Sequence, residues 1–156
     1  MEDPSSAQSE QLMALLAQRV EDHRADLTDR YLGVLRESLF SSRAEIRPSA
    51  LKSIAADEAE ALLHFLRQPG LSATERGEQL HQAGFDAGAV LRLSQMTRQF
   101  LLEHSENGQI APMLEIVDAY EMAVVEGFVR SIDNVNKAER AQLERVLTAL
   151  QQRGGS

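Results

Sequence analysis

A long stretch without a helix breaker near the C-terminus constrains the fold more than any other feature. Residues 110–152 contain a single glycine, Gly127, and their only proline, Pro112, stands in the first turn, where its missing N–H is not needed. As one helix these 43 residues would be about 65 Å long, whereas a domain of this size is only about 30 Å across. We therefore expect the first half to pack in a core. The second half, from about Asn134, must project, fold back or pair with another chain.

The apolar pattern divides this predicted helix. Its first part carries a stripe at helical spacing, typical of a core helix, formed by Met113, Val117, Tyr120, Val124, Phe128, Ile132 and Val135. Its second part, Asn136 to Arg153, is highly charged and keeps only Leu143, Val146 or Leu147, and Leu150 at heptad-like spacing. We expect packing within one chain to give way to packing between two chains near Val135 to Ala138.

The rest of the chain also has helical periodicity, and no segment alternates like a strand. Residues 1–8 are predicted to be a flexible arm because they are small and polar and include Pro4. Apolar positions then predict either one long helix to Phe40 or two helices with a bend near His23 to Asp26. Further helices follow from Pro48 to the Pro69-Gly70 stop, from Ser72 to Gly84, and from Asp86 to Asn107-Gly108. The predicted fold class is all-α.

Charge and composition exclude several classes of function. The 24 acidic residues outnumber the 16 basic ones and give a net charge of −8, which argues against binding to nucleic acid or to an anionic membrane. The chain has no cysteine, so disulfides, thiol chemistry and zinc–thiolate sites are excluded. No apolar run approaches the roughly 18 residues of a membrane span, and the first residues do not resemble a signal peptide. We expect a cytoplasmic protein.

The sequence contains no recognisable catalytic or metal-binding motif. Phosphate-binding glycine loops and the nucleophile elbow of hydrolases are missing. The neighbouring carboxylates Asp57, Glu58 and Glu60 are expected on a solvated helix face. Glu78 and His81 form one Glu-x-x-His pair, but a di-iron bundle site needs two such pairs. We therefore predict no catalytic residue, no metal site and no enzymatic activity.

Together with the order of the helices, three stretches carry a family resemblance: Gly77 to Phe85 with the helix that follows, Ala119 to Asn136, and Asn136 to Leu143. The chain resembles the N-terminal sensory domain of RsbR-type stressosome proteins, which are non-haem globins related to globin-coupled sensors. The resemblance implies a globin-like helical bundle that forms a homodimer. It also implies that the terminal helix leads, as a coiled coil, to a sulfate-transporter/anti-sigma-antagonist output domain or to another signalling partner.

We accordingly expect a non-enzymatic sensor domain over residues 9–135, a linker helix over 136–153 and a flexible tail over 154–156. A signal would pass from the sensor domain along the linker helix to the output domain or partner. The residues expected at the dimer interface and in the linker are Phe128, Ile132, Val135, Leu143, Val146 and Leu150.

The resemblance to non-haem globins implies no cofactor, and the alternative is a haem-binding sensor of gas or redox state. In that alternative His81, on a short helix just before a glycine, would be the proximal ligand. A small ligand would lie where a globin holds haem, between the helix that starts at Pro48, the short helix after Ser72 and the next one. Candidate residues there, which either line such a pocket or fill the space as core, are Leu62, Phe65, Leu80, Phe85 and Phe100.

Overall fold

The computed structural model describes residues 3–39, 46–70 and 72–155. Within these ranges the chain forms α-helices and one short 3-10 helix, with no strand, which confirms the all-α prediction. The elements are α1 (Pro4–Asp22), α2 (Arg24–Leu39), α3 (Pro48–Arg67), α4 (Ser72–Gln82), α5 (Ala87–Glu103), η1 (Asn107–Gln109) and α6 (Ile110–Gly154). None of the helices in the described part is both long and apolar enough to cross a membrane.

The first helix begins earlier than the sequence pattern predicts. The Asp3 carboxylate accepts the backbone N–H of Ser5 at 3.1 Å, and Pro4 occupies the first helical position. Residues 4–8 are therefore helical, which corrects the predicted start of the first helix after the expected flexible arm over residues 1–8; residues 1–2 of that arm lie outside the described residues. The predicted bend lies at His23, which separates α1 from α2, so the two-helix alternative holds. The predicted connection from Ser41 lies largely outside the described residues.

Local sequence sets the ends of the central helices. Pro48 starts α3, and Gln68 ends it by donating its backbone N–H to the His64 carbonyl oxygen at 2.7 Å. Gly84 has a φ of 95°, a conformation that favours glycine, and allows the chain to turn between α4 and α5. Asp86 then caps α5 by accepting the backbone N–H of Ala89 at 2.9 Å. Both the Gly84 stop and the Asp86 cap agree with the prediction.

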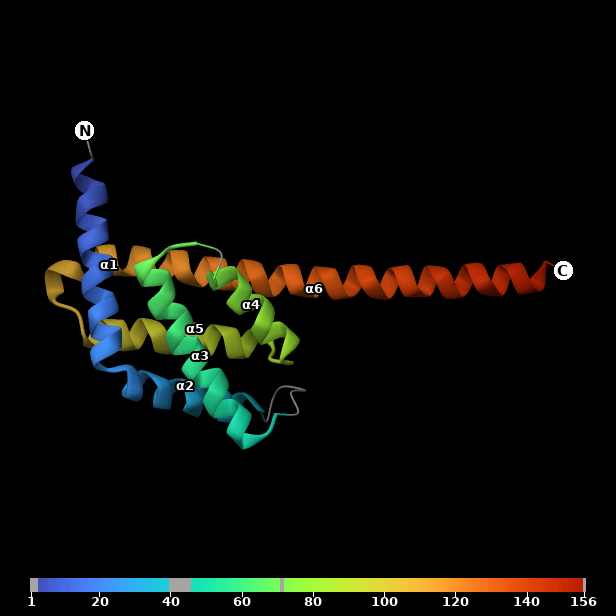
Figure 1. Cartoon of the computed structure of the whole chain (residues 1–156), viewed down its shortest axis with the longest axis horizontal. Coiled ribbons are helices and arrows are strands. Elements are labelled where there is room, and N and C mark those ends of the chain that lie inside the picture. The colour runs from blue at the N-terminus through green and yellow to red at the C-terminus, as the bar shows by residue number, and fades with distance from the viewer. Residues whose placement is uncertain (1–2, 40–45, 71, 156) are drawn as a thin grey trace.

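The last helix is continuous over 45 residues. Figure 1 shows that its first part packs beside the other helices, while its C-terminal part extends alone far beyond them. The predicted bounds of Ile110 to Gln152 are therefore confirmed to within two residues. The helix includes Gly154, which was expected in the flexible tail, and Gly155 follows in a turn.

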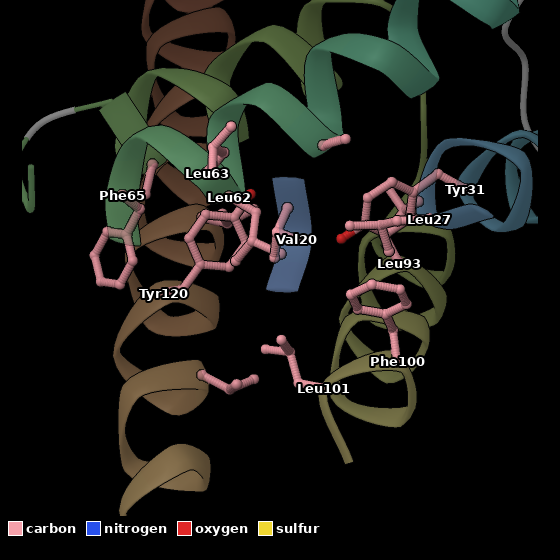
Figure 2. Packing of buried hydrophobic residues seen from close by; sticks show 14 of the residues in the cluster. Val20, Leu27, Tyr31, Leu62, Leu63, Phe65, Leu93, Phe100, Leu101 and Tyr120 are labelled. Carbon is pink, nitrogen blue, oxygen red and sulfur yellow. The ribbon is translucent and has the colours of Figure 1, made fainter. Parts of the chain in front are cut away.

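The core is one apolar cluster to which all six α-helices contribute. Val20 of α1 is fully buried near the middle of this cluster. Figure 2 shows the side chains of Leu62 and Leu63 on one side of Val20 and those of Leu93 and Phe100 on the other. Tyr120 of α6 projects into this cluster next to α3 (Figure 2). With few aromatic residues, the interior is filled mainly by leucine, valine and alanine.

Candidate functional site at the crossing of α4 and α6

Two glycines bring the backbones of α4 and α6 into direct contact. A Cβ atom added to Gly77 would lie 1.9 Å from the carbonyl oxygen of Val124. A Cβ atom added to Gly127 would lie 1.8 Å from the carbonyl oxygen of Thr74. Real Cβ atoms do not approach other atoms so closely, so only glycine fits at either position. No side chain separates the two helices here, so their backbones pack directly against each other.

Side chains extend this contact along α6. The Nδ1 atom of His81 lies 2.7 Å from the hydroxyl of Ser131, a buried residue of α6. The His81 ring also meets the Phe128 ring edge-on, with 5.2 Å between their centroids. The residue predicted as a possible haem ligand therefore packs against α6 and has a hydrogen-bond partner there.

A buried ion pair ties the α4–α6 crossing to α3. The Arg76 Nε–H of α4 donates to the Glu58 carboxylate of α3 at 2.5 Å, and the two side chains are 5% and 3% exposed. Arg76 also donates to the carbonyl oxygen of Ile54 at 2.9 Å. The second Glu58 oxygen accepts the hydroxyl of Tyr120 from α6 at 3.1 Å. Both charges are thus paired and hydrogen-bonded, as buried charges must be.

The expectation that Glu58 lies on a solvated face is wrong. Glu58 stands between Ala55 and Leu62 at spacings of three and four, so it belongs to the buried stripe of α3. Its partner Arg76 lies on another helix, and no spacing within one helix points to that pairing. The position of Glu58 in the stripe was the one available signal.

Two buried tyrosines, Tyr31 and Tyr120, add further polar groups to the core. Burial raises the pKa of Tyr120 well above its ordinary value, and the negative charge of Glu58 raises it further. Burial, followed by the same charge, also raises the pKa of Tyr31. The Tyr31 hydroxyl lies 2.5 Å from that of Thr97, which donates to the Leu93 carbonyl oxygen at 3.0 Å. Both tyrosines therefore stay protonated near neutral pH and act as hydrogen-bond donors.

A second cluster of aromatic and charged side chains lies at the break between α1 and α2. The rings of His23 and His104 stack with centroids 4.1 Å apart, and Phe100 lies 4.6 Å from His104. The pKa of His104 is lowered by burial and then by the neighbouring His23. Arg19 of α1 donates to the backbone carbonyl oxygen of His104, which holds α1 against the end of α5.

The five residues proposed to line a ligand pocket are all buried in the apolar cluster. Phe65 faces Tyr120 with ring centroids 5.3 Å apart, whereas Phe100 lies on the other side of the core, beside Leu101 (Figure 2). A surface groove of about 470 Å³ is lined instead by residues near the start of α1 and of α6. These positions favour the alternative in which the five residues, Leu62, Phe65, Leu80, Phe85 and Phe100, fill the core.

The residues expected at the dimer interface fall into two groups. Phe128 is only 5% exposed and packs on His81, so it belongs to the intrachain core, a correction to its expected place. Ile132 is half-buried. The other four, Val135, Leu143, Val146 and Leu150, are all exposed.

Comparison of the chain with protein-family models, with curated proteins and with solved structures gave no significant match. Its function is therefore inferred from the crossing of α4 and α6 and from the length of α6 that extends beyond the bundle.

Proposed function

We propose that this chain is a non-enzymatic signalling domain of the globin-like, RsbR type, which forms a homodimer and relays a change in its core along α6 to an output domain or partner. The observation that carries the proposal has two parts. The backbone of α6 packs directly against that of α4 at Gly77 and Gly127, and the C-terminal part of α6 extends well beyond the other helices. A helix with both properties connects the interior of the domain to a site at a distance.

The packing at the crossing of α4 and α6 supports the proposed relay. A ligand, a partner or a physical stress that shifts α4 acts on α6 at the glycine contact, at the bond between His81 and Ser131, and through the Arg76–Glu58–Tyr120 network. Close-packed contacts of this kind transmit displacements because no space absorbs them. The signal must bind or favour one arrangement of α4 over another, since only differential stabilisation moves an equilibrium.

The exposed apolar residues of α6 beyond the bundle support the proposed dimer. Leu143, Val146 and Leu150 are 62%, 50% and 58% exposed and lie on one side of the helix at heptad spacing. Pairing with a second α6 removes these side chains from water, and it also stabilises a helical segment whose side chains are nearly all exposed.

The relay is testable by hydrogen exchange in a pair of glycine variants. Gly77→Ala forces α4 away from α6, whereas Gly33→Ala in α2 introduces a methyl group with no atom within 4 Å. We expect Gly77→Ala to change the exchange rates of backbone amides in residues 136–153, many residues away from the substitution. Gly33→Ala should leave these rates unchanged.

A change in exchange that is confined to the crossing would contradict the relay. If Gly77→Ala keeps the helical fold and alters exchange only around α4 and residues 120–131, the overhanging part of α6 does not sense the core. The relay would then be rejected. His81→Ala, which removes the contact with Ser131 and not the glycine packing, gives a milder second perturbation of the same crossing.

A further inference from the structure

The two stacked histidines lie where the ends of three helices meet. His23 ends α1 at the break before α2, and His104 ends α5. The planes of the two rings are 22° apart with centroids 4.1 Å apart, and the His104 ring also packs on the buried ring of Phe100. Arg19 of α1 donates to the backbone carbonyl oxygen of His104. The end of α5 therefore contacts the α1–α2 break both through the ring of His104 and through its backbone.

The surroundings of the His104 ring fit a neutral imidazole. Its Nε2 atom is buried and has no hydrogen-bond partner among the residues that the structure describes. A neutral ring can keep this nitrogen as an unprotonated acceptor, whereas a protonated ring turns it into an N–H donor. A buried donor without a partner destabilises the state that contains it. In addition, two protonated rings stacked face to face repel each other.

The charged groups around His104 do not reverse this preference. Burial, and then the neighbouring His23, lower the pKa of His104; Arg30 acts in the same direction, whereas Glu103 and Asp26 oppose them. Both carboxylates are already paired with the guanidinium of Arg30, Glu103 at 2.6 Å and Asp26 at 3.2 Å. A proton on His104 therefore gains little from them, and the net effect is a lowered pKa.

We propose that the stacked rings of His23 and His104 form an acid-sensitive latch, which holds the α1–α2 break against the end of α5 and opens when His104 binds a proton. Opening separates the two rings and lets water reach Nε2, which gives the protonated ring the hydrogen-bond partner that it lacks in the closed form. The inference deepens the proposed function by naming the proton as a signal. The end of α5 leads through η1 to the start of α6, but the latch is tested without the relay.

The direction of the pH effect follows from the two forms of the junction. In the open form His104 has the ordinary histidine pKa of about 6.5, and in the closed form its pKa is lower. The open form therefore binds more protons below about pH 6.5, and the closed form loses stability until the pH has passed its own lower pKa. Acid thus favours opening. Opening is local, so amides far from the junction keep their protection against exchange.

Hydrogen exchange at single amides, followed by NMR, tests the latch. The amide of Leu27, bonded to the carbonyl oxygen of His23 at 3.0 Å, and the amide of His104 at the end of α5 both report on the junction. The amide of Gln68, which ends α3 close to the exposed His64, is the internal control. Between about pH 7.5 and about pH 5.5, protection corrected for the intrinsic exchange rate should fall at least about threefold at Leu27 and His104, and stay constant at Gln68.

Two variants separate His104 from the other titrating groups. His104→Phe keeps a flat ring for the stack but cannot bind a proton, so we expect the fall in protection at Leu27 to disappear. His64→Gln removes an exposed histidine elsewhere and should behave like the natural chain. Should His104→Phe fail to fold, an NMR titration of the His104 ring in the natural chain replaces it. Its midpoint should lie below about 6.5, with the fall in protection confined to the interval between that midpoint and about 6.5.

Three outcomes would overturn the latch. Equal losses of protection at Leu27 and Gln68 would indicate a general loss of stability, and an unchanged fall in His104→Phe would assign the effect to another group. A midpoint for the His104 ring at or above the ordinary histidine value would remove the cause of opening. The proposed function is decided separately, by exchange in residues 136–153 of Gly77→Ala, so an acid-sensitive junction supports the latch even where that relay fails.

Discussion

Arg76 and Glu58 carry opposite charges into the interior, and each depends on the other. Both side chains are almost fully buried, and Glu58 also accepts the Tyr120 hydroxyl. Removing one member of a buried pair leaves the other charge uncompensated, which costs about 3–5 kcal/mol. The cost arises from desolvation that pairing no longer offsets.

Replacing the buried arginine should therefore destabilise the fold strongly. We expect Arg76→Met to lower the free energy of unfolding in urea by about 3–5 kcal/mol, because Glu58 would remain buried without its cation. Arg92→Met, at an exposed position of α5, is the control and should change stability by no more than about 0.5 kcal/mol. Similar losses in the two variants would show that the buried pair has no special role.

Proton binding by His104 makes the free energy of unfolding depend on pH. Its pKa is lowered in the folded state by burial, then by His23, with Arg30 in the same direction and Glu103 and Asp26 opposing. The unfolded chain therefore binds more protons than the folded one as pH falls below the ordinary histidine pKa of about 6.5. The contribution of His104 to the free energy of unfolding is fully present above that pH, and it is lost as the pH falls through the lower pKa that His104 has in the folded state.

Urea titrations across this range test the effect of His104. We expect the natural chain to lose stability between neutral pH and about pH 5, and His104→Gln to lose less over the same interval. His64→Gln replaces an exposed histidine and should follow the natural chain. If His104→Gln loses as much stability as the natural chain, proton binding at His104 does not contribute.

Residue patterns predicted the buried faces well and the buried polar partners poorly. The stripe of α6 from Met113 to Val124 is buried as its spacing indicates. The Arg76–Glu58 pair joins two helices, and the stacked His23 and His104 join the ends of α1 and α5, so these contacts depend on how the helices pack. Periodicity within one helix contains no information on such partners.

At the scale of the element, α4 and α6 form one unit because glycine is required on both sides of their crossing. Any larger residue at Gly77 or Gly127 meets backbone atoms, which cannot move aside as a flexible side chain can. The two helices must then separate, and the residues around the crossing lose contacts.

We expect Gly77→Ala and Gly127→Ala each to reduce the free energy of unfolding by about 1–3 kcal/mol or more, measured by thermal denaturation. Gly33→Ala, where the added methyl group meets nothing, should instead stabilise α2 by up to about 1 kcal/mol, because alanine favours a helix. Stabilisation by alanine at all three glycines would contradict the close contact of α4 with α6.

The limits of the helices were largely predictable, because breakers and caps act locally. Asp86 caps α5 and Gly84 takes a left-handed conformation, as their residue types indicate. The start of α1 was not predicted, because the polar composition of residues 1–8 is typical of a flexible arm. Asp3 followed by Pro4 is nevertheless a helix-start signal, and it sets the start of α1. The sequence shows Gly127 only as a glycine inside a helix, because its close approach to the backbone of Thr74 depends on tertiary packing.

At the scale of the whole molecule, the overhanging part of α6 lies apart from the other helices. Residues 136–153 have nearly all their side chains exposed, and Figure 1 shows no other helix beside them. A chain ending at Asn136 should therefore keep the helical bundle. We expect its midpoint of thermal unfolding, measured on monomeric protein by circular dichroism, to match that of Leu143→Asp. A lower midpoint would show that the overhang supports the core.

The central claim is that α6 is a core helix on one face and a dimer interface on the other, and the mass of the natural chain in solution tests it most directly. Sedimentation equilibrium over a wide concentration range should give twice the mass of one chain at high concentration, with dissociation to monomer on dilution. A mass of one chain at the highest soluble concentration would contradict the claim.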